Sequence, residues 1–145
     1  MVMNIILGAL LLLVTCGMHL LGMIFVMHLL HLDQGPLRSR LLRVRAYLVG
    51  EVVIVMATVS VAEVLLWASA YILLGEIQSL EPAFYFSMVT FTTLGYGDIV
   101  LDESWRLLAG FEAATGIIMF GWTTAILIAV VQHCYFGKKL TGSPE

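Results

Sequence analysis

Three long apolar runs alternate with short polar segments along this chain. The runs cover residues 1–32, 46–75 and 105–133, and few charged residues interrupt them. About 20 apolar residues suffice to cross the hydrocarbon core of a bilayer, so each run is long enough to span it. The pattern predicts three transmembrane helices. The first run lacks the basic start and small-residue cleavage site of a signal peptide, so we expect it to be retained.

A shorter apolar stretch at 82–92 lies between the second and third runs and is too short to span. Pro82 suits the first turn of a helix, and the Glu81 carboxylate before it suits the positive helix end. We expect a short helix that enters the membrane, followed by a loop at 93–98 that leads back out. Non-helical backbone at that depth must be buried in protein or line water. The predicted fold is an all-α membrane protein with three transmembrane helices and one re-entrant helix per chain.

The composition supports a membrane protein. The 145 residues are 61% apolar and 12% charged, with a mean hydropathy of +1.00. Soluble domains are nearer half apolar and a quarter charged. No basic tract of the nucleic-acid-binding type is present, so we expect no nucleic-acid partner. Cys16 and Cys134 give no disulfide framework, and small buried thiols are the simpler interpretation.

Positive charge predicts the orientation. The linker 33–45 is basic, and Lys138 and Lys139 lie in the tail 134–145. Both segments should be cytoplasmic, which places the amino terminus outside and the carboxyl terminus inside. The linker arginines lie in a short polar loop rather than at every third residue of a span, which argues against a voltage sensor. Setting the topology fits them better, and an amphipathic surface helix touching anionic lipid is a second role compatible with their spacing. These arginines are Arg38, Arg40, Arg43 and Arg45.

The segment after the short helix reads Thr92-Thr93-Leu94-Gly95-Tyr96-Gly97-Asp98. Two glycines two residues apart let the backbone alternate between right- and left-handed conformations, which can point consecutive carbonyls at one axis. The segment resembles the selectivity filter of the tetrameric potassium-channel pore family, whose usual form is Thr-Val-Gly-Tyr-Gly. The resemblance covers a pore module at 46–133: an outer helix, the pore helix 82–92, the filter and an inner helix. The first span is an addition to this module.

The resemblance implies a homotetramer, because each chain carries one filter strand. The carbonyls of Thr93, Leu94, Gly95 and Tyr96, with the Thr93 hydroxyl, should replace the hydration shell of K⁺, and Gly97 completes the filter. It implies a potassium-selective channel that conducts passively and is not an enzyme. K⁺ in the filter is the only cofactor expected, with no organic cofactor. The economy of the chain suggests a multi-pass protein of a prokaryotic plasma (inner) membrane.

The surroundings of the filter follow the same pattern with two departures. We expect Tyr96 to pack against the short helix beside Tyr85 and Phe86, and the helix end near Thr92 to favour a cation below the filter. Leu94 stands where Val is usual, which changes only the packing behind the filter.

The second departure concerns the filter carboxylate. Val89 stands where some relatives have a Glu that pairs with the filter Asp. Asp98 must therefore find another partner or remain solvated.

The third span resembles the pore-lining helix of the family. Gly116 lies at the place of its hinge glycine, but close helix packing explains Gly116 equally well and explains Gly121 better. By the family pattern Phe120 and Thr124 should line the cavity.

The cytoplasmic half of the same helix is the expected gate. Ile128 and Gln132 are four residues apart, on one face, where four inner helices should converge. A ring of Ile128 side chains could then close the pore by dewetting.

Acidic residues inside the spans need partners. We expect Glu112 to accept a hydrogen bond from the short helix, for example from Thr90, and to brace the filter. Glu63 and His19 lie at a similar depth, which suggests a contact, although two separately satisfied side chains are the favoured alternative.

Three other functions remain open at this stage. A channel that also passes Na⁺ conflicts with the intact Tyr96-Gly97 pair. An accessory membrane subunit that binds K⁺ without conducting it would show no flux. A membrane enzyme with a metal at His19, Glu63 and His28 has no nucleophile–base pair and no dense ligand cluster to support it.

Overall fold

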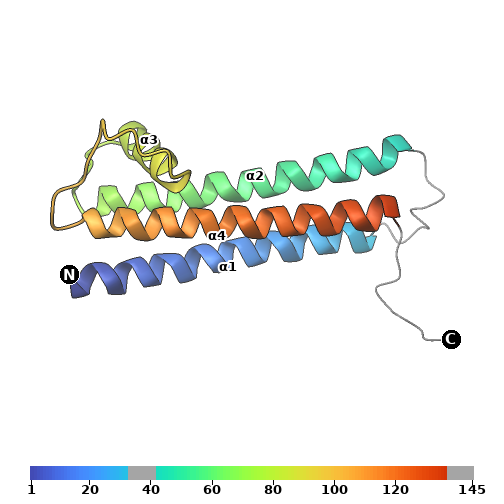
Figure 1. The fold of residues 1–145 in the computed structure, drawn as a ribbon, viewed down its shortest axis with the longest axis horizontal. Helices are drawn as coiled ribbons and strands as arrows, with labels where there is room; N and C mark the ends of the chain where they lie inside the picture. The colour runs from blue at the N-terminus through green and yellow to red at the C-terminus, as the bar shows by residue number, and fades with distance from the viewer. Residues whose placement is uncertain (33–41, 137–145) are drawn as a thin grey trace.

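The computed structural model describes residues 1–32 and 42–136. In this part of the chain, three helices are long and apolar enough to cross a membrane, which confirms the all-helical class and the three predicted spans. A short fourth helix lies between the second and third of them (Figure 1). The elements are α1 (Val2–Leu32), α2 (Leu42–Leu73), α3 (Leu80–Phe91), α4 (Arg106–Val131) and a π-helical turn, η2 (Gln132–Phe136).

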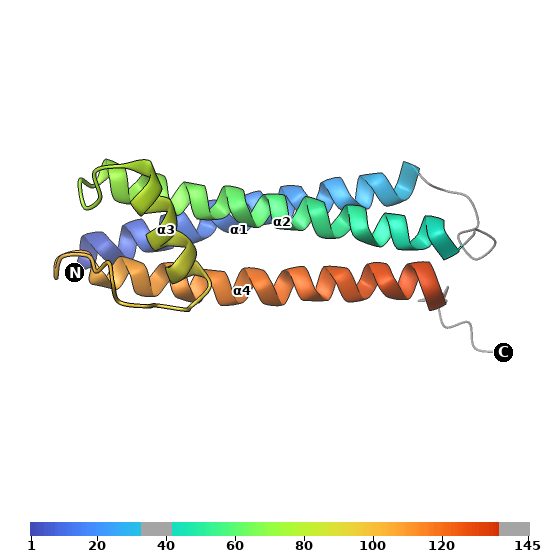
Figure 2. The same ribbon diagram turned by 90° about the horizontal axis from the view of Figure 1, so that it is seen from above.

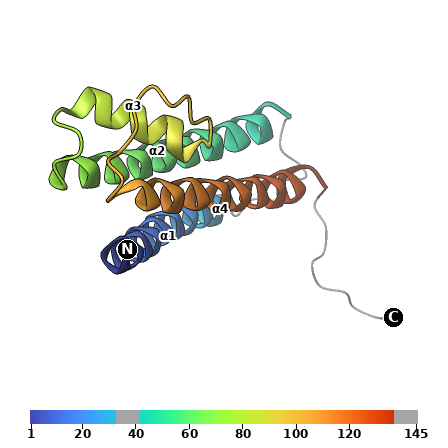
Figure 3. The same ribbon diagram turned by 60° about the vertical axis from the view of Figure 1, so that its left-hand side comes forward.

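The three long helices run side by side, and α3 lies across α2 and α4 near one end of the bundle (Figures 1 and 2). Figure 3 shows α1 and α3 on opposite sides of the α2–α4 pair. The segment after α3 runs back to the bundle end where α4 begins (Figure 1). The amino terminus lies at that same end, whereas α1 ends, α2 begins and α4 ends at the opposite end.

Two helix boundaries differ from the sequence-based expectation. Helix α2 begins at Leu42, four residues before the expected start at 46, so it includes Arg43 and Arg45. Arg is a good helix former, and its long side chain can carry the charge toward the membrane surface. Helix α3 begins at Leu80, and Glu81 and Pro82 lie in its first turn. The expectations for Arg38, Arg40 and the end of the tail fall outside the described residues.

One narrow face of α1 packs against the rest of the protein. Its buried positions recur every three or four residues, as a single helical stripe requires. Most of them are polar side chains or glycine, whereas the large apolar side chains of α1 face outward. This inversion suits a helix in lipid, where small and polar residues mediate helix contacts. The stripe consists of Asn4, Gly8, Leu11, Thr15, His19, Gly22 and Val26.

Two apolar clusters hold the bundle together. The first lies around the fully buried Trp67 and Tyr71 of α2, where α3 packs on α2 and α4. The second lies in the other half of the bundle and joins Val26 of α1, Val52 of α2 and Ile126 of α4. Helix α3 and the loop that follows it therefore rest on a packed platform.

Candidate functional site

The loop at 92–98 continues directly from the end of α3. The amide of Thr93 donates to the carbonyl of Thr90 at 2.9 Å. The amides of Leu94 and Gly95 both reach the carbonyl of Val89, at 2.9 and 3.2 Å. These bonds satisfy carbonyls that a helix end otherwise leaves open, and they fix how the loop leaves the helix.

Every second residue of this loop has a left-handed backbone. The φ angles are +61° at Thr93, +54° at Gly95 and +78° at Gly97. Glycine adopts such angles without penalty, but a positive φ at a β-branched residue is a true outlier. Strained backbone of this kind concentrates at functional sites. The positive φ angles fall at alternate positions, as the spacing of the two glycines predicts.

The loop side chains are open in the single chain. Tyr96 is 67% exposed. The two aromatic residues expected beside it contact other groups: Phe86 packs edge-on against Tyr71, with 5.1 Å between ring centroids, and the Tyr85 hydroxyl bonds elsewhere. The packing of Tyr96 against α3 stays a prediction.

Asp98 has the partner that the sequence left open. The Tyr85 hydroxyl donates to Asp98 Oδ2 at 2.7 Å, and the amide of Ile99 donates to Oδ1 at 3.1 Å. Hydrogen bonds to the ionised form favour it, so these contacts, with the Tyr85 bond as the main cause, hold the pKa of Asp98 below its ordinary range. Tyr85 therefore ties the end of the loop back to α3 in place of a glutamate at Val89.

Glu112 joins three helices at a completely buried position. Tyr71 of α2 donates to Glu112 Oε2 at 2.5 Å, and Ser87 of α3 hydrogen-bonds Oε1. Ser87 also donates to the carbonyl of Val64 at 2.8 Å. Glu112 thus has a partner on the short helix, as expected, but the residue is Ser87 and not the suggested Thr90, which lines a pocket on another side of α3.

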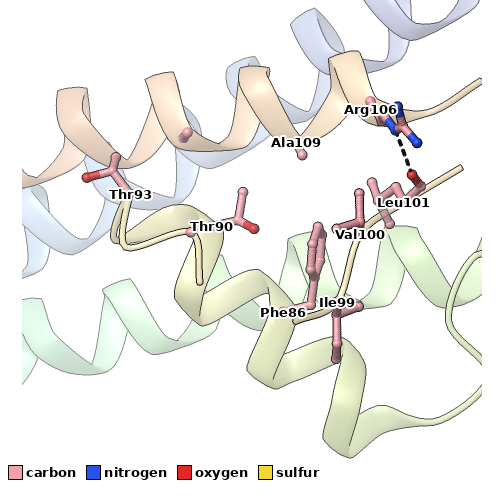
Figure 4. Close-up of a pocket in the computed structure, with 10 residues that line it drawn as sticks. Phe86, Thr90, Thr93, Ile99, Val100, Leu101, Arg106 and Ala109 are labelled. Carbon is pink, nitrogen blue, oxygen red and sulfur yellow. Dashed lines mark hydrogen bonds between the residues drawn. The ribbon is translucent and has the colours of Figure 1, made fainter. Parts of the chain in front are cut away.

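That pocket, of about 380 Å³, lies between α3, the returning segment and the start of α4 (Figure 4). Thr90 and Thr93 line one end of it. At the other end Arg106 Nε donates to the carbonyl of Leu101 at 3.2 Å, which fixes the returning segment to α4. The loop is therefore held at its two ends, and a space remains between its middle and α4.

Gly116 is where α4 comes closest to α3. A Cβ built on Gly116 would lie 1.9 Å from the carbonyl oxygen of Phe91. No side chain fits there, which supports the packing interpretation of Gly116; the hinge stays a prediction. By contrast, a Cβ on Gly121 would meet nothing within 4 Å. The close packing expected at Gly121 is therefore not present in the single chain.

The residues expected to line a cavity and gate share one exposed face of α4. They are spaced four residues apart and all are exposed, with 42% of Phe120 and 53% of Ile128 accessible. Thr124 returns its hydroxyl to the carbonyl of Phe120 at 2.8 Å, and Gln132 begins the π-helical turn. Phe91 of α3 packs edge-on against Phe120, with 5.7 Å between ring centroids, so α3 covers part of this face, whereas the exposed part around Ile128 is available to other molecules.

His19 and Glu63 are in contact, so the alternative of two separately satisfied side chains is wrong. His19 Nδ1 lies 2.9 Å from Glu63 Oε1, and both side chains are completely buried. The other ring nitrogen lies 3.3 Å from the hydroxyl of Thr123 in α4. His28 is exposed and about 13.5 Å further along α1. Among residues 1–32 and 42–136, no group of three or more His, Cys, Asp or Glu side chains could hold a metal ion.

Sequence reasoning missed Tyr71, Ser87 and Thr123. Each is a hydroxyl-bearing residue in an apolar helix, and each is the partner of a buried ionisable group. The useful signal was present: a buried acid in a membrane span needs donors at its own depth. Counting residues along each helix gives the depth of each side chain in the membrane and so reduces the number of possible hydrogen-bond donors. A single sequence does not show which face of each helix contacts its neighbours.

Comparison with known proteins shows the family to which this chain belongs. The sequence profile of an ion channel family matches residues 59–133, just over half of the chain. The chain belongs to this ion channel family. The family is one of channels rather than enzymes, and with the three apolar helices it identifies a membrane protein.

Three curated relatives of this ion channel are potassium channels. The voltage-gated potassium channel Kch of Escherichia coli (strain K12) is 38% identical over 69 residues, 47% of this chain and 16% of Kch. The two-pore potassium channel 4 of Arabidopsis thaliana is 41% identical over 59 residues, 40% of this chain and 20% of its own. The potassium voltage-gated channel protein shk-1 of Caenorhabditis elegans is 32% identical over 62 residues, which are 42% of this chain and 12% of shk-1. The match thus spans at most a fifth of each of these relatives. No solved structure gives a significant match.

Proposed function

We propose that this protein is a potassium-selective channel whose filter is the loop that follows α3. The carbonyls of Thr93, Leu94, Gly95 and Tyr96, with the Thr93 hydroxyl, replace the water around K⁺. The observation that carries the proposal is the alternation of left-handed backbone at Thr93, Gly95 and Gly97, directly behind a short helix. The named potassium channels among the relatives support the choice of ion.

Four copies of the chain surround one axial pore. A dehydrated K⁺ needs oxygen ligands on all sides, and one strand supplies them from one side only. In the single chain the filter loop is exposed, and so is the α4 face that includes Phe120 and Ile128. A fourfold assembly places both around the axis, with α4 lining the cavity and α1 on the periphery, since α1 lies on the side of the bundle opposite to α3.

Helix α3 is the re-entrant pore helix, and the filter faces the outside of the cell. Arg43 and Arg45 lie at the bundle end opposite to α3, and basic residues favour the cytoplasmic side. The amino terminus is then outside and the carboxyl terminus inside, in the plasma (inner) membrane of a prokaryote. The arginines at 38–45 contact anionic lipid, and Asp98 lies with other carboxylates at the outer mouth, where they raise the local concentration of cations.

The test is potassium flux from vesicles that contain only the purified protein. We expect flux that Ba²⁺ blocks, a reversal potential in mixed salts that follows K⁺ rather than Na⁺, and a particle mass of four chains. A reversal potential midway between the two ions would contradict selectivity. Tetramers without flux would favour an accessory subunit, and a monomer would remove the shared pore.

A matched pair of variants tests the filter itself. Gly97→Ala and Gly17→Ala each add one methyl group where nothing lies within 4 Å, but only Gly97 has a positive φ. We expect Gly97→Ala to abolish potassium-selective flux and Gly17→Ala, in the peripheral α1, to retain it. Equal flux from both would show that the backbone of this loop does not form the filter.

A further inference from the structure

Helix α1 contacts the pore-lining helix on both sides of Gly116. Toward the filter, Gly8 lies so close to Phe111 that a Cβ on Gly8 would approach the phenyl ring to 2.6 Å. Seven residues past Gly116, His19 Nε2 lies 3.3 Å from the Thr123 hydroxyl, and the His19 ring packs at a tilt against Trp122, with 5.1 Å between ring centroids. Helix α1 therefore contacts α4 both before and after Gly116, the residue at which α4 packs closely on α3.

The two halves of α4 are held differently. The outer half is fixed to α3 at Gly116 and through the buried hydrogen bonds of Glu112. The contact between His19 and Thr123 joins the inner half to α1 by a hydrogen bond between side chains. Apolar contacts such as Ile126 with Val26 also hold this half. Lipid tails can replace apolar contacts at little cost, but they cannot replace a hydrogen bond.

Charge balance decides the direction of that bond. Glu63 Oε2 is buried without a partner, so a net charge on the His19–Glu63 pair would be costly in the bilayer. The pair is neutral if Glu63 gives its proton to His19, and also if it keeps it and donates to Nδ1. A third neutral form, with the proton on Glu63 Oε2, would leave a buried O–H donor without an acceptor, so the first two forms are favoured. In both cases His19 Nε2 carries a hydrogen, so it donates to Thr123, and the Thr123 oxygen accepts.

We infer that α1 is a latch on the pore-lining helix, with His19 as the positioning residue and Thr123 as its acceptor. The latch rests on the proposed channel function. In the structure α4 is straight and the latch is engaged, which holds four inner helices together at Ile128 and keeps the pore closed (Figure 1). Bending of α4 below Gly116 moves Thr123 away from His19 and opens the pore.

The test compares single-channel open probability in planar bilayers for three variants with the unmodified protein. Thr123→Val removes the acceptor at nearly constant volume, whereas Thr123→Ser keeps it. Thr15→Val is the matched control, because the Thr15 hydroxyl is fully buried but accepts from Trp67 of α2 at 3.2 Å, not from α4. A hydrogen bond inside a membrane protein is worth about a threefold change in an equilibrium.

We expect Thr123→Val to raise the ratio of open to closed time by about threefold for each participating subunit. Thr123→Ser and Thr15→Val should match the unmodified channel. The latch proposal is wrong if Thr123→Val leaves the open probability unchanged or lowers it, or if Thr15→Val raises the open probability by the same amount. Particle mass and helical circular dichroism of each variant show that the assembly is intact. An unmodified protein without flux would remove the channel proposal itself, whereas normal flux with an unaltered Thr123→Val would remove only the latch.

Discussion

Gly116 packs its backbone directly against the main-chain carbonyl of Phe91, where a single methyl group would lie 1.9 Å from the oxygen. The contact joins α4 to the last residue of α3, just before the proposed filter. Because both partners are backbone, neither can turn aside as a flexible side chain could. The position of the filter relative to α4 therefore depends on the absence of a side chain at Gly116.

Gly116→Ala should destabilise the protein by about 3 kcal/mol, the upper end of the usual cost of overpacking, because the added methyl group against rigid backbone forces α3 and α4 apart. The measurement is the unfolding free energy in mixed detergent micelles. Gly121→Ala is the control: a Cβ there meets nothing within 4 Å in the chain, and Ala is favoured over Gly in a helix by about 0.5–1 kcal/mol. Equal stability of the two variants would contradict the close approach.

Tyr85→Phe should raise the pKa of Asp98 toward the ordinary range of Asp, because the variant loses the bond that lowers it. A depressed pKa means that the contact stabilises the filter at pH above the unfolded value and loses this effect as the pH falls through the folded pKa. In the unmodified channel the filter should therefore weaken only at strongly acidic external pH, and in the variant at a higher pH. Carbon NMR titration of labelled aspartate checks this, with Tyr47→Phe as the control. An unshifted Asp98 titration in Tyr85→Phe would exclude the contact.

Glu112→Gln should be nearly neutral, whereas Glu112→Leu should cost about 2–4 kcal/mol. Ser87 has one hydroxyl hydrogen but lies within bonding distance of both the Val64 carbonyl and Glu112. A protonated Glu112 satisfies all these groups, and a glutamine amide reproduces its donor and acceptor. Leucine leaves the Tyr71 and Ser87 hydroxyls without their partner. Unfolding in mixed micelles measures both variants, and a large loss in Glu112→Gln would show that the carboxylate form is required.

Ile128→Ala and Ile128→Asp should both raise open probability in bilayer recordings, because a smaller or charged ring admits water to a dewetted constriction. Ile118→Ala is the control, since Ile118 is similarly exposed but lies on another face of α4. Unchanged open probability in both Ile128 variants eliminates this residue as the gate.

The elements of the fold were visible in the sequence because bilayer thickness sets the length of an apolar run. The first turn of α3 was predictable as well, because a helix accepts proline in its first turn but not in its interior, and this fixes the position of Pro82. The partners of the site were less accessible. The bond between Tyr85 and Asp98 and the choice of Ser87 over Thr90 depend on how α3 is rotated about its axis, and an apolar helix carries little periodicity from which to read that rotation.

The packing face of α1 is an instructive exception. A contact of α1 with α2 was suggested only through His19 and Glu63, and a contact with α4 was not expected. Yet Asn4, Gly8, Thr15 and Gly22 repeat at helical spacing with His19, and in a membrane span the scarce small and polar residues mark the side that meets protein. The same rule predicts less for α2 and α4, because each of them packs on several neighbours and has no single buried stripe.

The burial of Glu63 against α1 has a consequence for how the protein is made. The ribosome delivers the first helix to the bilayer before the second, so His19 is already in place when Glu63 arrives. A shortened version cut down to the two-span core would insert a carboxyl group with only hydrocarbon around it. We therefore expect that deleting the first helix would impair insertion of the protein into the membrane before any effect on conductance could be measured.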